Sequence, residues 1–179
     1  MAFSERTRWM GASPIHGWAG LDAEQRVHSC LALVVDGITA TPDDLRGMDE
    51  RVIQEVEDDQ PARLAHAYRC FLASAGMGAG KFLQGSDVFH PRIIGVRGIA
   101  QELLDEQGLT LEENDRVILM HQGYQFDFLR GEGADPEVWS CSEGEVPERR
   151  YARFTDWLRA NAEEQTNAWA HLAPLYGNG

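Results

Sequence analysis

The sequence lacks the features that would direct a chain into a membrane or an oxidising compartment. Its longest apolar run, residues 31–35, is far too short to cross a bilayer, and its N-terminus has no apolar stretch typical of a signal peptide. Only three cysteines are present, without a CxxC pair. Because Cys30, Cys70 and Cys141 each lie in an apolar segment, we expect buried, reduced thiols and a cytoplasmic protein.

Basic residues are also scarce. The 16 Lys and Arg stand against 29 Asp and Glu, and the formal net charge is -13. Such a negative field repels phosphate backbones and anionic lipid headgroups, which disfavours direct binding to nucleic acid or to a membrane surface. The same field attracts a basic protein, although acidity alone also keeps a protein dissolved. The charge therefore favours a basic protein partner.

Motifs for nucleotide, metal or cofactor binding are missing too. Residues 76–81 end in Gly-Lys, as a phosphate loop does, but Ala75 stands where the first glycine is required. Phe82 replaces the hydroxyl residue that would hold Mg²⁺. The six histidines do not cluster in the sequence and form no HExxH motif. We therefore expect no cofactor, no metal and no enzymatic activity.

One catalytic alternative depends on how the chain folds. Asp87, His90 and His121 would form a small polar site if the fold brought them together. A histidine at the end of a strand is more often a hydrogen-bonded structural residue than a ligand. An enzyme is therefore the most distant of our hypotheses.

Apolar residues at helical spacing predict five helices. Their starts carry Asp, Thr or Pro, which suit the first turn, and glycine follows the ends of three of them. The predicted helices run from Asp22 to Gly37, over about 42–58, from Leu64 to Gly76, from Val96 to Gly108, and onwards from Thr155 as N-cap.

Strand patterns occupy the second half of the chain. Arg116–Met120 is a short apolar strand, Tyr124–Phe128 alternates aromatic with polar residues, and Val138–Cys141 follows an acidic turn. Helices first and a strand meander later predict an α+β fold, with a largely antiparallel sheet and helices packed on one face. We divide the chain into an N-terminal extension with one helix, residues 1–40, and an α+β domain, residues 41–179.

Two motifs carry a resemblance to a known family. Residues 68–72 read Tyr-Arg-Cys-Phe-Leu on a predicted helix, and residues 121–126 read His-Gln-Gly-Tyr-Gln-Phe on a predicted strand. With the segment 154–158, they resemble the SUKH superfamily of SMI/KNR-type bacterial immunity proteins, over about residues 41–160. Asp127 stands where the family commonly has an aromatic residue; a solvent-facing position would tolerate this departure, and the sequence leaves the polarity of that sheet face open.

This resemblance implies a SUKH-like α+β fold and, for bacterial members, neutralisation of a polymorphic toxin. We therefore expect a non-enzymatic immunity protein that binds and blocks a cognate toxin, such as a basic nuclease. A nuclease presents Lys and Arg to its substrate phosphates, so an acidic inhibitor suits it. The alternative is a regulatory or scaffold protein of the same fold with another partner.

Acidic residues near the predicted turns are our candidates for contact with that partner, because loops are most free to specialise. Two other acidic stretches, residues 43–59 and 102–115, are expected to be solvated helix faces and a connecting loop. The candidate contact residues are Glu132, Asp135, Glu137, Glu143 and Glu145.

Overall fold

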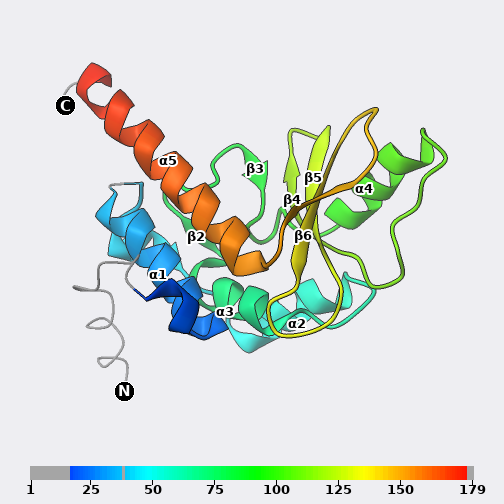
Figure 1. The fold of residues 1–179 in the computed structure, drawn as a ribbon, viewed down its shortest axis with the longest axis horizontal. Helices are drawn as coiled ribbons and strands as arrows, with labels where there is room; N and C mark the ends of the chain where they lie inside the picture. The colour runs from blue at the N-terminus through cyan, green and yellow to red at the C-terminus, as the bar shows by residue number, and fades with distance from the viewer. Residues whose placement is uncertain (1–16, 38, 177–179) are drawn as a thin grey trace.

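The fold, known from a computed structural model that describes residues 17–37 and 39–176, combines two antiparallel sheets with helices (Figure 1). Strands β1 and β2 form a small pair, and β3-β4-β5-β6-β7 form a five-stranded sheet in chain order. The predicted α+β class with a largely antiparallel sheet is confirmed. The elements are α1 (Ala23–Asp36), β1 (Leu45–Arg46), α2 (Glu50–Asp58), α3 (His66–Ala75), β2 (Gly78–Ala79), β3 (Ser86–Asp87), α4 (Val96–Asp105), β4 (Arg116–His121), β5 (Gln125–Arg130), β6 (Glu137–Ser142), β7 (Glu148–Tyr151) and α5 (Phe154–Tyr176).

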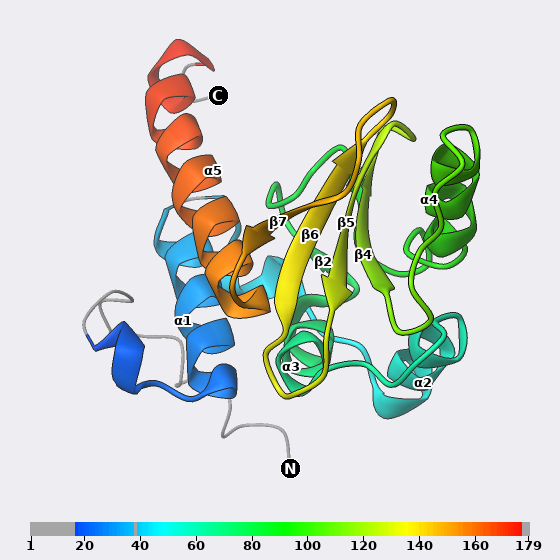
Figure 2. The same ribbon diagram turned by 45° about the vertical axis from the view of Figure 1, so that its right-hand side comes forward.

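Helices cover the large sheet from both sides. The four consecutive β4 residues Val117–Met120 are buried. Because successive strand residues point to opposite faces, both faces of β4 must be covered. Figure 2 shows α5 and α1 on one side of the sheet and α4 on the other, where it packs against β4. The expectation of helices on one face is therefore incomplete.

Helix α1 confirms the helix predicted in the N-terminal region. Asp22 accepts a hydrogen bond from the Gln25 backbone N–H at 2.8 Å, and the Gln25 side chain accepts one from the Asp22 N–H at 3.0 Å. This reciprocal capping box satisfies two N–H groups that the helix itself leaves unpaired. Val27, Leu31 and Val34 are buried where α1 packs against α3 and α5. Residues 1–16 of the predicted extension lie outside the described residues.

The helix predicted over residues 42–58 is wrong in its first half. Pro42–Asp44 form only a 3₁₀ turn, and the chain then extends to pair β1 with β2. A Cβ at Gly47 would collide with the Ala73 carbonyl of α3, so the close approach of two backbones interrupts the helix here. Helix α2 starts afresh after Asp49, whose carboxylate accepts a backbone N–H as N-cap.

The last strand and helix differ in detail from the sequence prediction. Strand β7 was not predicted, because its residues Glu148–Tyr151 are largely exposed and carry no apolar alternation. Helix α5 begins at Phe154, so Thr155 lies inside the first turn and is not the N-cap. Trp157 and Leu158 are buried as expected. Among the described helices, none is both long and apolar enough to span a bilayer.

Candidate functional site

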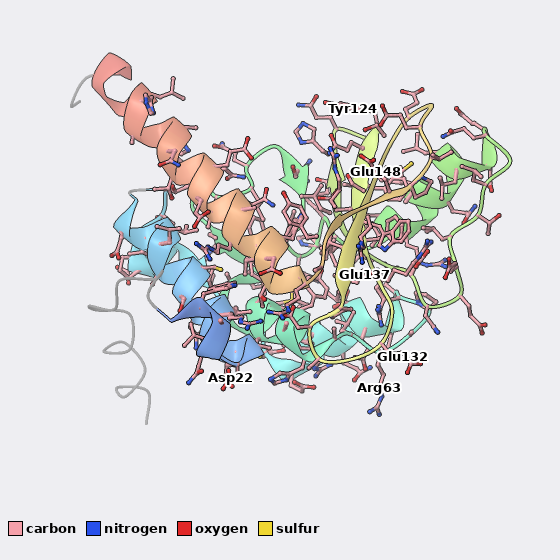
Figure 3. The ribbon with its side chains drawn as sticks, in the orientation of Figure 1. Asp22, Arg63, Tyr124, Glu132, Glu137 and Glu148 are labelled. Atoms are coloured by element: carbon pink, nitrogen blue, oxygen red, sulfur yellow. The ribbon has the colours of Figure 1, made fainter. Side chains whose placement is uncertain are left out.

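The five-stranded sheet separates the candidate acidic residues into two groups. β5 pairs with β6 from Arg130 opposite Glu137 to Gln125 opposite Ser142. The turn 131–136, with Glu132 and Asp135, therefore lies at one end of this hairpin, and the turn 143–147, with Glu143 and Glu145, lies about 20 Å away at the other. In Figure 3, Glu132 is at the lower end of the sheet, while Tyr124 and Glu148 are at the upper end.

The lower turn, residues 131–136, caps two helices, and we call it the helix-capping turn. Its Ala134 carbonyl accepts a hydrogen bond from the Ala67 N–H of α3 at 2.8 Å. The residue before α3 is Ala65, whose side chain offers no acceptor. The first N–H groups of a helix have no partner within that helix. The turn therefore supplies an acceptor that the local sequence of α3 lacks.

The carboxylate of Asp135, in the helix-capping turn, is bound to other residues of the fold. Its carboxylate accepts hydrogen bonds from the Thr155 N–H at 2.9 Å and from the Thr155 hydroxyl at 2.6 Å. Its Oδ2 also lies 3.7 Å from the guanidinium of Arg26, and both side chains are nearly buried. Asp135 thus caps α5 and joins it to α1, in place of the cap predicted at Thr155.

Glu137 is also engaged within the molecule. One carboxylate oxygen accepts a hydrogen bond from the Trp139 indole N–H at 2.7 Å, and the other lies 3.4 Å from the Arg149 guanidinium. The Arg130 guanidinium stacks 4.5 Å above the Trp139 ring. These contacts hold Glu137 at the start of β6, directly after the helix-capping turn.

Glu132 is the exposed acid of the helix-capping turn. It lies beside Arg116, which donates to the Gly131 carbonyl at 2.6 Å. Burial lowers the pKa of Arg116, and the negative charges of Asp115 and Glu132 offset part of this effect. Glu132 therefore contributes electrostatically to the same turn without a direct bond to it.

The upper end of the sheet has a different character. The β4–β5 turn, residues 122–124, lies against the β6–β7 turn, residues 143–147, because the Glu143 N–H donates to the Tyr124 carbonyl at 2.7 Å. We call these two segments the exposed turn pair. The side chains of Glu143 and Glu145 are exposed and form no ion pair within the part of the chain that the structure describes.

Two large apolar side chains accompany these acids. Tyr124 is 42% exposed and Val146 is 68% exposed. The Tyr124 ring packs edge-to-face against His121 with centroids 5.7 Å apart, and the Ser86 hydroxyl holds the His121 ring at 2.9 Å. Tyr124 is thus positioned from two strands while much of its surface meets solvent.

The three residues of the catalytic alternative have separate partners. His121 bonds to Ser86, Asp87 pairs with Arg92 at 2.6 Å, and His90 lies 3.5 Å from Glu55 of α2. His121, at the end of β4, is hydrogen-bonded, as we expect for a histidine in this position. These contacts give no support to a shared polar site of Asp87, His90 and His121.

Asp127, whose environment the sequence left open, is buried. Its carboxylate accepts a hydrogen bond from the Trp157 indole N–H at 2.8 Å, which links β5 to α5. Burial raises the pKa of Asp127, and interactions with Ser140 and Trp157 lower it in part. Trp157 on the facing helix thus supplies a donor for this buried acid.

Sequence reasoning missed one group of potential metal ligands. Cys30 and Cys141 are buried free thiols as expected, but Cys70 is only half-buried. It faces His66 one helical turn away, and Glu24 of α1 lies beside both. The spacing of four between His66 and Cys70 on a predicted helix was the signal available in the sequence.

Comparisons of the chain with protein-family models, with curated proteins and with solved structures found no match. The resemblance to the SUKH superfamily therefore stays a prediction.

Proposed function

We propose that the protein is a toxin-neutralising immunity protein that binds a basic toxin through the exposed turn pair. The observation that carries this proposal is the combination of a positioned, half-exposed Tyr124 with Glu143 and Glu145, which have no counter-ion among the described residues. Aromatic anchors with charged surroundings are typical of protein-binding surfaces. The partner would be a toxin that carries Lys and Arg on its active face.

In this proposal the acids and the aromatic side chain have different tasks. The net charge of -13 draws a cationic partner towards the molecule and speeds encounter, most strongly at low salt. Tyr124 and Val146 then lose water on contact and slow dissociation, since buried aromatic anchors carry much of the energy of an interface. Tyr124 is held by His121 before binding, so little conformational freedom is lost.

The other acids on our candidate list are less available to a partner. Asp135 is bound to Thr155 and Arg26, and Glu137 to Trp139 and Arg149. A partner that used either carboxylate would have to displace bonds that hold the fold. Glu132 is exposed but lies at the opposite end of the hairpin from Tyr124.

This mode of action needs no bond-making chemistry, and we include the absence of enzymatic activity and a cytoplasmic location in the proposal. The protein would block the toxin sterically, by covering its active face, and electrostatically, by pairing with its basic residues. A regulatory protein of the same fold would bind its partner through a surface of the same kind. Binding alone therefore does not separate the two functions, and the test must also measure protection of cells from the toxin.

Co-expression with each toxin domain that neighbouring genes encode tests the proposal. We expect the protein to restore growth and to co-purify with the toxin, and Tyr124→Ala to weaken both effects. A Glu132→Ala variant serves as the control, because it changes an exposed acid far from the proposed surface. If the wild-type protein neither protects nor forms a complex with any adjacent toxin domain, the proposal is wrong.

A further inference from the structure

His66 and Cys70 face the start of α1 where α1 and α3 pack side by side (Figure 1). The two residues are one turn apart on α3, so their side chains share one helix face. The Cys70 Sγ atom lies 3.6 Å from His66 Nε2 and 4.0 Å from Nδ1. Glu24, in the first turn of α1, completes a group whose three donor atoms all lie within 4.8 Å of one another.

These separations suit a tetrahedral zinc ion. With Zn–N bonds of about 2.0–2.1 Å and a Zn–S bond of about 2.3 Å, tetrahedral geometry holds nitrogen and sulfur about 3.6 Å apart. The Cys70–His66 distance has this value. A carboxylate oxygen of the exposed Glu24 side chain lies within 4.8 Å of both of these donor atoms. Thiolate, imidazole and carboxylate are all ligands that zinc accepts.

The charge around the thiol is negative. Asp22, labelled in Figure 3, precedes α1 and lies near enough to act on Cys70. The carboxylate of Glu24 lies beside the Cys70 Sγ atom. Arg69, the basic residue next to Cys70 in the chain, pairs with Glu57 and Glu50 of α2. A divalent cation would balance the excess negative charge.

Helix capping explains part of this cluster but not all of it. Asp22 is the N-cap of α1, and an acid such as Glu24 suits the positive end of a helix. Neither role requires an imidazole and a thiol from the adjacent helix to face these acids. The half-exposed position of Cys70 also leaves the group open to ions from solvent.

We propose that Glu24, His66 and Cys70 form a zinc site that joins α1 to α3, with water or Asp22 as the fourth ligand. Zinc would tie the N-terminal helix to the helix that carries the Tyr-Arg-Cys-Phe-Leu motif. This inference does not depend on the proposed toxin partner, because none of these residues belongs to the exposed turn pair.

Metal titration of the full chain, without a histidine tag, tests the site. We expect one zinc ion per chain in competition with a chromophoric chelator, and a thiolate-to-cobalt charge-transfer absorption when Co²⁺ replaces zinc. Cys70→Ser should abolish that absorption, and Cys70→Ser, His66→Ala and Glu24→Gln should each weaken zinc binding at least about tenfold. His171→Ala is the control, since this exposed histidine on α5 lies outside the group and should leave binding unchanged.

Three results would overturn the proposal. The first is no zinc binding at all, and the second is zinc binding that persists unchanged in Cys70→Ser and His66→Ala. The third is displacement of zinc by a moderate excess of Mg²⁺, because this would mean that the ion binds the acidic surface in general and not these three ligands. Circular dichroism of each variant checks that the fold is kept, and Glu24→Gln alters only an exposed side chain.

Discussion

The two ends of the β5–β6 hairpin are similar in composition but differ in the contacts that they make. Both turns contain glycine and several acids, yet the carboxylate of Asp135 and the carbonyl of Ala134 are used to cap α5 and α3. At the other end, Glu143 and Glu145 project into solvent beside Tyr124. The acid content of a turn therefore does not identify a binding surface. The bonds that each acid already makes separate the acids that stabilise the fold from those that are available to a partner.

The first prediction concerns the helix-capping turn and has the largest expected effect. Asp135→Ala removes two hydrogen bonds to Thr155 and leaves Arg26 without its carboxylate, so the free energy of unfolding should fall by about 2–4 kcal/mol. Urea denaturation followed by circular dichroism measures the change.

Asp135→Asn is the matched control, since its amide oxygen still accepts from the Thr155 N–H. It should cost less than half as much as Asp135→Ala. An equal loss of unfolding free energy in both variants, or a change below about 0.5 kcal/mol in Asp135→Ala, would contradict a capping role for Asp135. The difference between the two ends of the hairpin would then have no basis in stability.

The second prediction concerns the exposed turn pair. If the proposed toxin binds here, Tyr124→Ala should weaken its binding by about 10- to 100-fold, because an anchor side chain is lost from the centre of the proposed contact. The same change should alter the free energy of unfolding by less than about 1 kcal/mol, since much of the ring is already exposed. Calorimetry and denaturation report the two quantities separately. A Tyr124→Phe variant keeps the ring and should bind nearly normally; an affinity unaffected by Tyr124→Ala would exclude this surface.

The third prediction concerns Asp127, the acid buried on β5 between the two ends of the hairpin. Its expected effect on stability is the smallest of the three, because burial raises the pKa of Asp127 while its hydrogen bonds lower it. The folded pKa lies above the unfolded value, so the folded state binds the proton more tightly. The contribution of this group to stability is therefore lost as pH rises through the folded pKa. Asp127→Asn keeps an acceptor for the Trp157 indole N–H but has no group that titrates at this position. The free energy of unfolding of this variant, relative to that of the wild type, should therefore rise from pH 4 to pH 7. A difference that does not change with pH would contradict the raised pKa.

Local patterns predicted most of the secondary structure. Helices α1, α3 and α4 and strands β4 to β6 follow from apolar periodicity and from capping residues. The break at Gly47 was not predictable, because it depends on a contact with the Ala73 carbonyl of another helix. Strand β7 was missed because an exposed edge strand needs no apolar alternation.

The candidate site was only partly predictable for a related reason. The sequence correctly marks acids near turns, but the partners of Asp135 are Thr155 and Arg26, which lie far from it along the chain. Only folding distinguishes Asp135 from Glu143. The pair His66 and Cys70 was detectable from its helical spacing, whereas the contribution of Glu24 required the packing of α1 on α3.

Association kinetics of two matched charge reversals test the central claim most directly. Glu143→Lys and Glu132→Lys make the same change in net charge at opposite ends of the hairpin, and both residues are exposed. The rate of association with the toxin, measured by stopped-flow at several salt concentrations, should fall several-fold more for Glu143→Lys and lose more of its salt dependence. Equal rates for the two variants, or a larger loss for Glu132→Lys, would show that the exposed turn pair does not meet the partner.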